Sequence, residues 1–332
     1  MEKVVLGLSG GVDSAVTAGL LKRQGFDVTG LFLDIGQKSS RDDAQEVADF
    51  WGIPLIVKDI SEELEENVCN PFTQCYIKGE TPNPCILCNP KVKFKTLCDA
   101  ADKIGAEYIA TGHYARSING NIYRALSTND QSYMLCRLLR EQANRLILPL
   151  GEFPKTEIRK IAEEMGVPVA KKPDSMEICF IPDKDYIGWI SKRAKMPPAG
   201  DIMFHGEVIG QHEGIHRYTV GQRLPGLHDG VKIYVTELDP VNNLVIAATS
   251  EELFKTEVRV RDMSWMIEPP KGEVKASVKV RHTKLECPTC TVFPGENGEA
   301  LIVCDSPVRA PARGQAAAIY DGDMLLGGGI II

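Results

Sequence analysis

Residues 7–14 read Gly-Leu-Ser-Gly-Gly-Val-Asp-Ser, a segment suited to binding a phosphate group. It follows an apolar run at residues 4–6 and precedes a helix-like stretch. Glycines let backbone N–H groups approach phosphate oxygens, and the start of a helix adds positive potential. Ser9 and Ser14 add hydroxyl donors. The spacing is neither that of Walker A nor Gly-x-Gly-x-x-Gly. The alternative is an ordinary glycine turn between a strand and a helix.

A cysteine pair is the second group that could do chemistry. Residues 81–89 read Thr-Pro-Asn-Pro-Cys-Ile-Leu-Cys-Asn, so two prolines stiffen a loop that carries Cys85 and Cys88. A Cys-x-x-Cys pair suits a metal, a cluster or a redox disulfide. A second pair, Cys287 and Cys290, could complete a four-cysteine zinc site only by joining distant parts of the chain. We prefer to interpret the second pair as thiols that pack within a strand or are exposed.

Cys179 is the third notable cysteine. It follows a polar loop at residues 171–175 and lies in an apolar stretch, residues 177–180, which predicts a short strand. Taken alone, this context favours a buried structural thiol. The chain has ten cysteines and no sign of a secretory segment, since Met1 leads directly into a short strand, so we expect thiol chemistry or metal binding in a cytoplasmic protein.

The secondary structure of the first 150 residues must position these groups. Strand and helix signals alternate along this part of the chain. Apolar runs predict strands at residues 4–8, 28–33, 55–57 and 108–111, with helices at 13–24 and 41–51. Short apolar strands separated by helices predict a doubly wound parallel sheet with its site at the carboxyl ends of the strands. Ser9, Leu33 and Gly112 all lie at such ends.

The rest of the chain changes character. Pro154 and Gly166 bracket a helix at residues 154–165. Beyond residue 200, short β-rich runs recur at 207–209, 233–238, 244–247, 274–281, 291–293, 301–303, 316–319 and 324–326. This pattern is typical of small β domains or a barrel. We therefore predict a catalytic domain at residues 1–150, a connecting segment at 151–200, a small β-rich domain at 201–257 and a barrel at 258–332.

Composition limits the class of protein. Of the 332 residues, 43% are hydrophobic and 25% are charged, as in a globular protein, and no apolar stretch approaches the length of a membrane span. The net charge of −7 does not indicate nucleic-acid binding, although local basic patches can provide it. Lys91, Lys93 and Lys95 form one such patch beside the cysteine motif. On its own, a solvated surface is the favoured interpretation of these lysines.

Several motifs in order resemble the tRNA-specific 2-thiouridylase family over nearly the whole chain. Residues 7–14 resemble the PP-loop of enzymes that cleave ATP between its α and β phosphates. The other motifs are Thr-Pro-Asn-Pro with Cys88, residues 110–114, 130–133, 174–175, 178–180, 218–223, 314–315 and 327–329. The resemblance implies a PP-loop domain, a small central domain and a C-terminal β-barrel. It implies ATP- and Mg²⁺-dependent transfer of sulfur to C2 of the wobble uridine, position 34, of tRNA.

The resemblance also implies roles for individual residues. Cys88 matches the nucleophile and Cys179 the cysteine that carries the persulfide, which would arrive from a sulfur donor such as a cysteine desulfurase or a sulfur relay protein. The residues implied to contact ATP are Gly7, Leu8, Ser9, Gly10, Gly11, Val12, Asp13, Ser14, Leu33 and Gly112. Those implied to meet the target base in the anticodon loop are Asn83, Pro84 and Cys85. Those implied to touch tRNA elsewhere are His113, Asn129, Asp130, Gln131, Arg281, His282 and Gln315.

Three positions depart from the family pattern. Cys85 stands where Asp is commoner, Asn129 where Lys is usual, and His282 where Tyr is frequent. With Cys85, the chain has three cysteines in an arrangement that resembles a different branch of tRNA thiolases, in which Cys85, Cys88 and Cys179 would hold a [4Fe-4S] cluster. The persulfide route, another PP-loop adenylating activity, and a non-catalytic tRNA-binding role are the alternatives.

Overall fold

A five-stranded parallel sheet forms the centre of the N-terminal domain in the computed structural model. The structure describes residues 1–332 except 37, 175–177, 182–183, 227–229 and 284–286. Every neighbouring pair in the sheet is parallel, so the carboxyl ends of its strands share one edge. In sheet order the strands are β3 (Leu55–Asp59), β2 (Asp27–Asp34), β1 (Lys3–Gly7), β4 (Tyr108–Ala110) and β7 (Leu146–Ile147).

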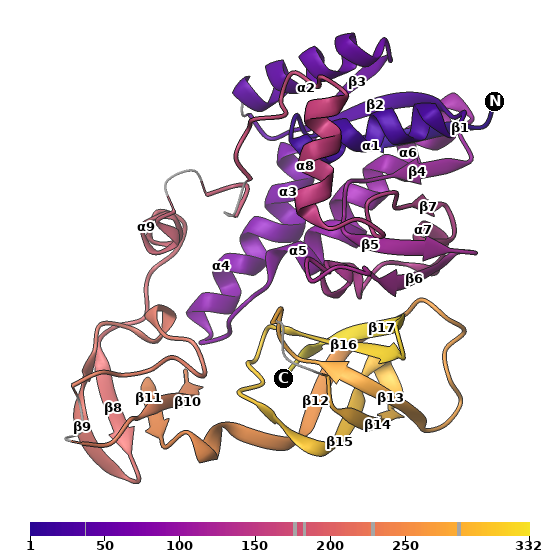
Figure 1. The fold of residues 1–332 in the computed structure, drawn as a ribbon. Helices are drawn as coiled ribbons and strands as arrows, with labels where there is room; N and C mark the ends of the chain where they lie inside the picture. The colour runs from indigo at the N-terminus through magenta and orange to yellow at the C-terminus, as the bar shows by residue number, and fades with distance from the viewer. Residues whose placement is uncertain (37, 175–177, 182–183, 227–229, 284–286) are drawn as a thin grey trace.

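Helices cover both faces of this sheet (Figure 1). Val4 and Leu6 of β1 pack into one hydrophobic cluster and Val5 into the other, as the alternation of a fully buried strand requires. The first cluster includes residues of α1 (Val12–Arg23), α2 (Lys38–Trp51) and α8 (Lys155–Glu164). The second includes residues of α6 (Phe94–Ile104) and α7 (Arg140–Asn144).

A helical arm extends from the sheet toward the rest of the molecule (Figure 1). Its elements are α3 (Ser61–Leu64), the π-helical turn η1 (Glu65–Cys69), α4 (Asn70–Ile77), α5 (Pro84–Cys88) and a second π-helical turn, η2 (Asn89–Lys93). Helix α9 (Tyr186–Ser191) packs its Ile190 with Phe72 of α4. π-helical turns are rare and are often found at functional sites. The cysteine pair lies directly before η2.

A small middle domain is built on a four-stranded sheet in the order β10-β11-β8-β9. Its strands are β8 (Gly200–Phe204), β9 (Glu207–His212), β10 (Tyr234–Asp239) and β11 (Leu244–Ala248). Ile202, Val235 and Val245 lie in its own hydrophobic cluster. A separate core is consistent with a separately packed domain.

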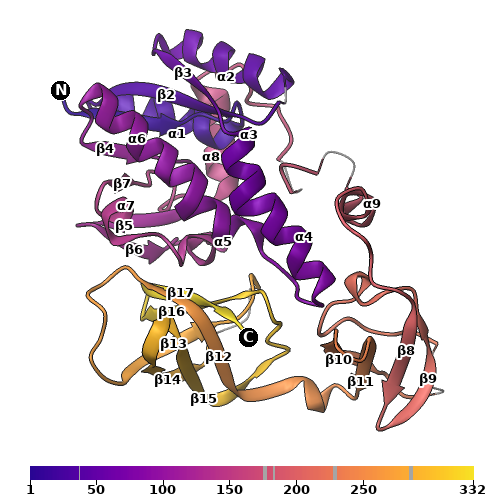
Figure 2. The same ribbon diagram turned by 180° about the vertical axis from the view of Figure 1, so that it is seen from behind.

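The C-terminal domain is a closed six-stranded barrel, because β12 pairs with both β15 and β17. Its strands are β12 (Phe254–Trp265), β13 (Val274–Lys279), β14 (Thr289–Pro294), β15 (Ala300–Arg309), β16 (Ala316–Asp321) and β17 (Met324–Ile331). A hairpin of the N-terminal domain, β5 (Ala115–Ile118) and β6 (Asn121–Arg124), extends the barrel sheet through β17. Figure 2 shows the barrel beneath this hairpin from behind.

The fold class predicted from the sequence is confirmed: a doubly wound parallel sheet, a small central domain and a β-barrel. The strand signals missed the short strands β5, β6, β7 and β8 and one long strand, β12. The alternation of β12 is visible in the sequence, because the buried Val258 and Val260 alternate with the charged residues Glu257, Arg259 and Arg261. The predicted domain boundaries remain a proposal, and two contacts cross them: α8 packs in the core of the sheet, and the β5–β6 hairpin joins the barrel.

Candidate active site at the PP-loop and the cysteine pair

The loop between β1 and α1 has the geometry of an anion cradle. Gly10 has φ +72, and a Cβ there would lie 2.7 Å from the carbonyl oxygen of Ser40, so only glycine fits. Gly11 is the N-cap of α1, and no side chain caps the helix. The first N–H groups of α1 therefore have no partner from a capping side chain and are available to an anion.

Two serines shape the cradle from inside. The hydroxyl of Ser14 accepts a hydrogen bond from the Ser9 backbone N–H at 3.2 Å and lies 3.1 Å from the Ser9 hydroxyl. It donates to the carbonyl of Gly11 at 3.1 Å. The Ser9 side chain is exposed at the loop surface. These bonds fix the loop and leave a hydroxyl at its rim.

Asp13 lies in the first turn of α1 and is half-buried. The hydroxyl of Tyr114 donates to its Oδ1 at 2.7 Å, and Lys155 Nζ lies 3.6 Å from its Oδ2. Burial and the neighbouring Asp13 carboxylate raise the pKa of Tyr114, so the phenol stays protonated and keeps donating. The carboxylate is thus held in place beside the cradle.

Helix α8 and the chain that follows it add basic residues that the sequence motifs did not reveal. Lys155 Nζ lies 2.9 Å from Oδ2 of Asp174, and Arg159 donates to the other oxygen of that carboxylate at 2.7 Å. Lys172 donates to the carbonyl of Gly10 at 3.1 Å and pairs with Asp43. The only sequence signal was the helix at 154–165 followed by a polar loop. The adjoining motif residues Ser175 and Glu177 lie outside the described residues.

The end of β4 presses against the start of α1. A Cβ on Gly112 would lie 3.0 Å from the carbonyl carbon of Asp13 and 3.1 Å from the Ser14 nitrogen. The next residue, His113, bonds Thr111 through Nδ1 at 2.8 Å and stacks on Phe94. Burial, with a smaller effect of Lys93, lowers the pKa of His113 to about 3, so its ring is neutral.

The cysteine pair lies on α5, a single turn that begins at Pro84. Asn83 caps this turn, since its Oδ1 accepts the N–H of Cys85 at 3.1 Å. Cys85 is exposed and Cys88 is half-buried. Partial burial raises the pKa of Cys88 to about 11, while the charge of Lys93 opposes that rise. Lys93 also favours the thiolate through its backbone N–H, because η2 turns it back toward Cys88.

Cys179 is neither in a strand nor buried, so both expectations were wrong. It lies in a turn with its side chain exposed. Its neighbours explain this: Phe180 packs on Phe72 at 5.4 Å and Ile178 joins the same cluster, so the apolar residues anchor the segment on either side of the thiol. Cys179 is close enough to Cys88 to raise its pKa. The structure therefore brings together two thiols that are 91 positions apart in the numbering.

Comparison with known proteins shows which family the chain belongs to. The model of the tRNA methyl transferase HUP domain matches residues 2–183, that of the tRNA methyl transferase PRC-barrel domain 191–249, and that of the aminomethyltransferase β-barrel domain 255–331. tRNA-specific 2-thiouridylase MnmA 2 of Thermoanaerobacter sp. (strain X514) is 41% identical over 99% of this chain and 98% of its own. tRNA-specific 2-thiouridylase MnmA of Clostridium perfringens (strain ATCC 13124) is 39% identical over the same shares. The chain belongs to the tRNA-specific 2-thiouridylase family.

Solved structures resemble this thiouridylase family member only in part. NMN synthetase from Francisella tularensis gives a TM-score of 0.38 at 24% identity, over 52% of this chain and 66% of its own. A 4-thiouridine synthetase in complex with RNA and ATP gives 0.38 at 20% identity, over 57% and 50%. Scores this low carry no information about function.

The thiols of Cys85, Cys88 and Cys179 in this thiouridylase lie near one another, because Cys85 and Cys179 both raise the pKa of Cys88, and Cys85 also raises that of Cys179. Within the described part of the chain, no three His, Cys, Asp or Glu side chains come close enough to hold a metal ion. A [4Fe-4S] cluster is larger than a single ion and is held by more widely spaced thiolates, so the cluster on Cys85, Cys88 and Cys179 stays a prediction from the resemblance. The second pair does not complete a zinc site either. Cys290 is buried opposite Cys304 in the barrel sheet, and Cys287 accepts from Arg124 at 3.1 Å.

Residues implied to touch tRNA lie where the N-terminal domain meets the barrel, and many of their polar groups are already used. Asp130 accepts the N–H groups of Ala125 and Ser132 at 3.1 and 3.0 Å. The Gln131 side chain accepts the N–H of Tyr114 at 3.0 Å. Asn129 is exposed. Some of the polar groups implied to touch tRNA therefore already make hydrogen bonds within the protein.

The barrel residues at this boundary, which we call the seam, also make hydrogen bonds within the protein. Arg281 donates to the carbonyls of Ala310, at 2.9 Å, and Val220, and so joins the barrel to the middle domain. His282 Nε2 lies 3.3 Å from the Asp130 carbonyl oxygen. Gln315 donates to the carbonyl of Thr81 at 2.9 Å.

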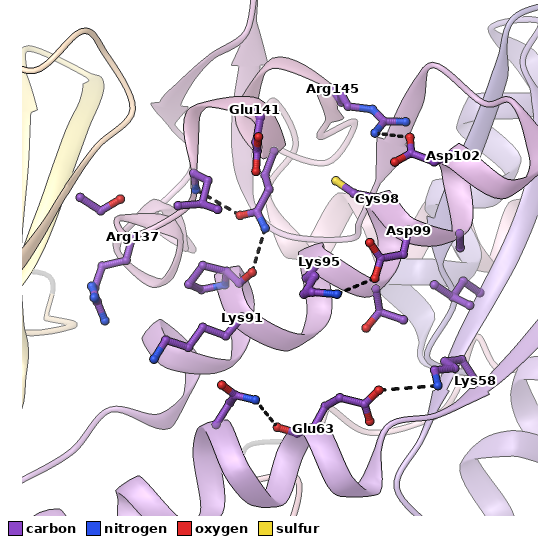
Figure 3. Close-up of a pocket in the computed structure, with 18 of the residues that line it drawn as sticks. Lys58, Glu63, Lys91, Lys95, Cys98, Asp99, Asp102, Arg137, Glu141 and Arg145 are labelled. Atoms are coloured by element: carbon purple, nitrogen blue, oxygen red, sulfur yellow. Dashed lines mark hydrogen bonds and ion pairs between the residues drawn. The ribbon is translucent and has the colours of Figure 1, made fainter.

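A groove of about 1160 Å³ lies away from these groups, beside α6 (Figure 3). Lys91 and Lys95 line it, but the PP-loop, Lys93 and the three thiols do not. Lys95 pairs with Asp99 at 2.7 Å, as Figure 3 shows, whereas Lys93 is turned to the thiols. The lysine patch predicted from the sequence is therefore divided between two sites by the π-helical turn.

Proposed function

We propose that this protein transfers sulfur to C2 of the wobble uridine, position 34, of tRNA in an ATP-dependent reaction. The observation that carries this proposal is that one chain of the thiouridylase family has both an uncapped helix start at its PP-loop and two neighbouring thiols, Cys88 and Cys179. A uracil carbonyl oxygen is a poor leaving group. Adenylation would convert it into AMP, which a sulfur nucleophile can displace.

ATP suits the cradle of residues 7–14, with Leu33 and Gly112 at the neighbouring strand ends. Its β and γ phosphates would lie against the first N–H groups of α1, and Lys155 is near enough to share their charge. The Asp13 carboxylate fits Mg²⁺, which is usually held by one or two carboxylates together with phosphate oxygens. Bound Mg²⁺ would offset the charge of the departing pyrophosphate.

Sulfur transfer would use the two thiols. The uridine oxygen attacks the α-phosphorus and pyrophosphate leaves. The terminal sulfur of a Cys179 persulfide then attacks C2, and AMP leaves with the oxygen. The Cys88 thiolate attacks Sγ of Cys179, so a Cys88–Cys179 disulfide forms and the second sulfur remains on C2 as 2-thiouridine. A thiol reductant afterwards restores both cysteines.

The partners follow from this chemistry. Asn83, Pro84 and Cys85 begin α5 and would meet a uridine that has turned out of the anticodon loop, where stacking is weaker than in a duplex. The family resemblance implies further tRNA contacts at His113, Asn129, Asp130, Gln131, Arg281 and His282. The exposed position of Cys179 suits a sulfur donor protein, such as a cysteine desulfurase or a relay protein. In the described residues no helix is long and apolar enough to span a membrane.

The decisive experiment incubates the protein with ATP, Mg²⁺, a persulfide-loaded donor and unmodified tRNA. We expect 2-thiouridine at position 34 by mass spectrometry, with one pyrophosphate released per thiolation, and neither product with a tRNA that has cytidine at that position. Pyrophosphate release without thiolation would indicate another adenylating activity. tRNA binding without pyrophosphate release would indicate a non-catalytic binding protein.

A further inference from the structure

The loop that leads to the cysteine pair is fixed by the barrel. Both backbone polar groups of Thr81 are bonded to one barrel turn: its N–H donates to the Arg313 carbonyl at 2.7 Å, and its carbonyl accepts Gln315 Nε2 at 2.9 Å. Between these two bonds lies Gly314, with φ +87. A Cβ on Gly314 would meet the carbonyl carbon and oxygen of Thr81 at 3.1 Å, so the two backbones are in close contact.

The turn that holds Thr81 is itself firmly attached to the barrel. Gly314 donates to the Ile331 carbonyl at 2.9 Å, and Ile331 donates back to the Gln315 carbonyl at 2.8 Å. The turn is therefore bonded to the last barrel strand on one side and to the cysteine loop on the other. Because the turn is held on both sides, its position determines the position of Thr81.

The path from Thr81 to the thiols is short and stiff. Pro82 and Pro84 fix their own φ angles, and Asn83 between them caps α5 through the N–H of Cys85. α5 then carries Cys88 at its end. A displacement of Thr81 would consequently move the whole turn instead of being lost in a flexible linker.

Other contacts bring all three domains to the same point. Arg261 of β12 lies 3.5 Å from Glu80, the residue before Thr81. The Thr81 hydroxyl donates to that of Thr219, in the middle domain, at 3.4 Å. The bonds from Gln315 and Arg313 are the shortest of this set, so the barrel turn is the main support.

We propose that Gln315 is a positioning residue for the cysteine loop, acting through Thr81. This inference rests on the proposed thiolation, since it concerns the placement of Cys88 for that reaction. The barrel would then determine the position of the Cys88 thiol, which attacks Sγ of Cys179 in the proposed reaction. The side chain of Gln315 is committed to the protein before any RNA is bound.

The test compares Gln315→Met, which keeps the shape of the side chain but removes its donor, with Arg313→Ala as a matched control. Arg313 is on the same turn, its side chain is exposed, and its carbonyl bond to Thr81 is unaffected by truncation. For Gln315→Met we expect kcat for thiolation to fall about tenfold while the Kd for tRNA changes less than about twofold, because misplacing a reacting group affects the chemical step. Arg313→Ala should keep kcat.

A second measurement does not require thiolation at all. The rate at which iodoacetamide alkylates Cys88, followed by peptide mass spectrometry without ATP or tRNA, should change in Gln315→Met and not in Arg313→Ala. Circular dichroism and the melting temperature establish that both variants fold. A weaker tRNA Kd with unchanged kcat would show that Gln315 contacts tRNA and would overturn the proposal, as would unaltered kcat and alkylation. If the wild-type chain makes no 2-thiouridine, the proposed function fails, while the alkylation comparison still decides the positioning role.

Discussion

The PP-loop edge and the seam between the N-terminal domain and the barrel are both rich in polar residues, but they use them differently. At the PP-loop, Gly11 begins an uncapped helix, and the donors of its first turn have no capping side chain. At the seam, Arg281 and Gln315 donate to the backbone carbonyls of Val220 and Thr81, which belong to other domains. Available donors indicate a ligand site, whereas donors bonded within the protein indicate support. A motif in the sequence does not distinguish the two.

The largest effect is expected at the PP-loop, where Asp13→Asn should lower the rate of thiolation by about 100-fold or more, since it removes a charge placed for the phosphates and Mg²⁺. The amide oxygen can still accept the Tyr114 hydroxyl, so the melting temperature should change little. Asp13→Ala should lose the same activity and also destabilise the fold by about 1–3 kcal/mol, because it leaves that hydroxyl unpaired. Thiolation of position 34, measured by mass spectrometry, and thermal melting are the readouts. Wild-type rates in Asp13→Asn would remove Asp13 from the proposed site.

How much could be predicted from the sequence depended on the range of the interactions. The cradle was predictable because residues 7–14 are contiguous in the sequence. Its glycines directly before a helix start indicated a backbone conformation that other residues rarely adopt, and Gly10 has φ +72. The parallel sheet followed from its apolar runs. The pairing of Asp13 with Lys155 could not be predicted from spacing, because it joins two helices about 140 positions apart.

Side-chain direction was the other limit. The run at residues 177–180 looked like a strand with a buried thiol, yet Phe180 and Ile178 take the buried places and leave Cys179 exposed. Likewise Lys91, Lys93 and Lys95 looked like one patch, but a π-helical turn changes the angular spacing and turns Lys93 to Cys88. Periodicity arguments assume regular elements, so they fail where a local irregularity redirects a side chain.

The next effect concerns Cys85, the position that departs from the family pattern. Because the proposed persulfide route uses only Cys88 and Cys179, we expect protein purified without oxygen to contain no stoichiometric iron and to thiolate tRNA from a persulfide donor. Cys85→Ser should keep most of this activity, while Cys88→Ser and Cys179→Ser should lose it. Iron analysis and the absorbance near 400 nm, together with thiolation assays, are the measurements. Brown protein that loses both iron and activity in Cys85→Ser would instead establish a cluster.

A moderate effect is expected from Lys93, which belongs to the active-site side of the comparison. Partial burial raises the pKa of Cys88 to about 11, so its alkylation rate should keep rising with pH beyond neutrality. Lys93 opposes this by stabilising the thiolate, while Cys85 and Cys179 act in the opposite sense. Lys93→Gln should therefore move the profile to higher pH and slow alkylation at pH 8 by about three- to tenfold, a shift of about 0.5–1 pKa unit. Lys91→Gln, on the same turn but facing the groove, is the control, and an equal change in both variants would contradict a specific role of Lys93.

The smallest effect concerns the salt dependence of tRNA binding, in which we compare Lys91 of the groove with Arg281 of the seam. tRNA affinity should fall with salt, because phosphate contacts release counterions. Lys91 is exposed at the groove, so Lys91→Gln should weaken binding and reduce the slope of log K against log salt by about 1 if it meets a phosphate. Arg281→Gln should leave that slope unchanged and lower the melting temperature, since its guanidinium joins Ala310 and Val220 within the protein. Binding titrations of both variants over a range of salt concentrations decide this. A reduced slope in Arg281→Gln with normal stability would show that a seam residue can still serve the RNA, and the distinction between the two regions would no longer hold.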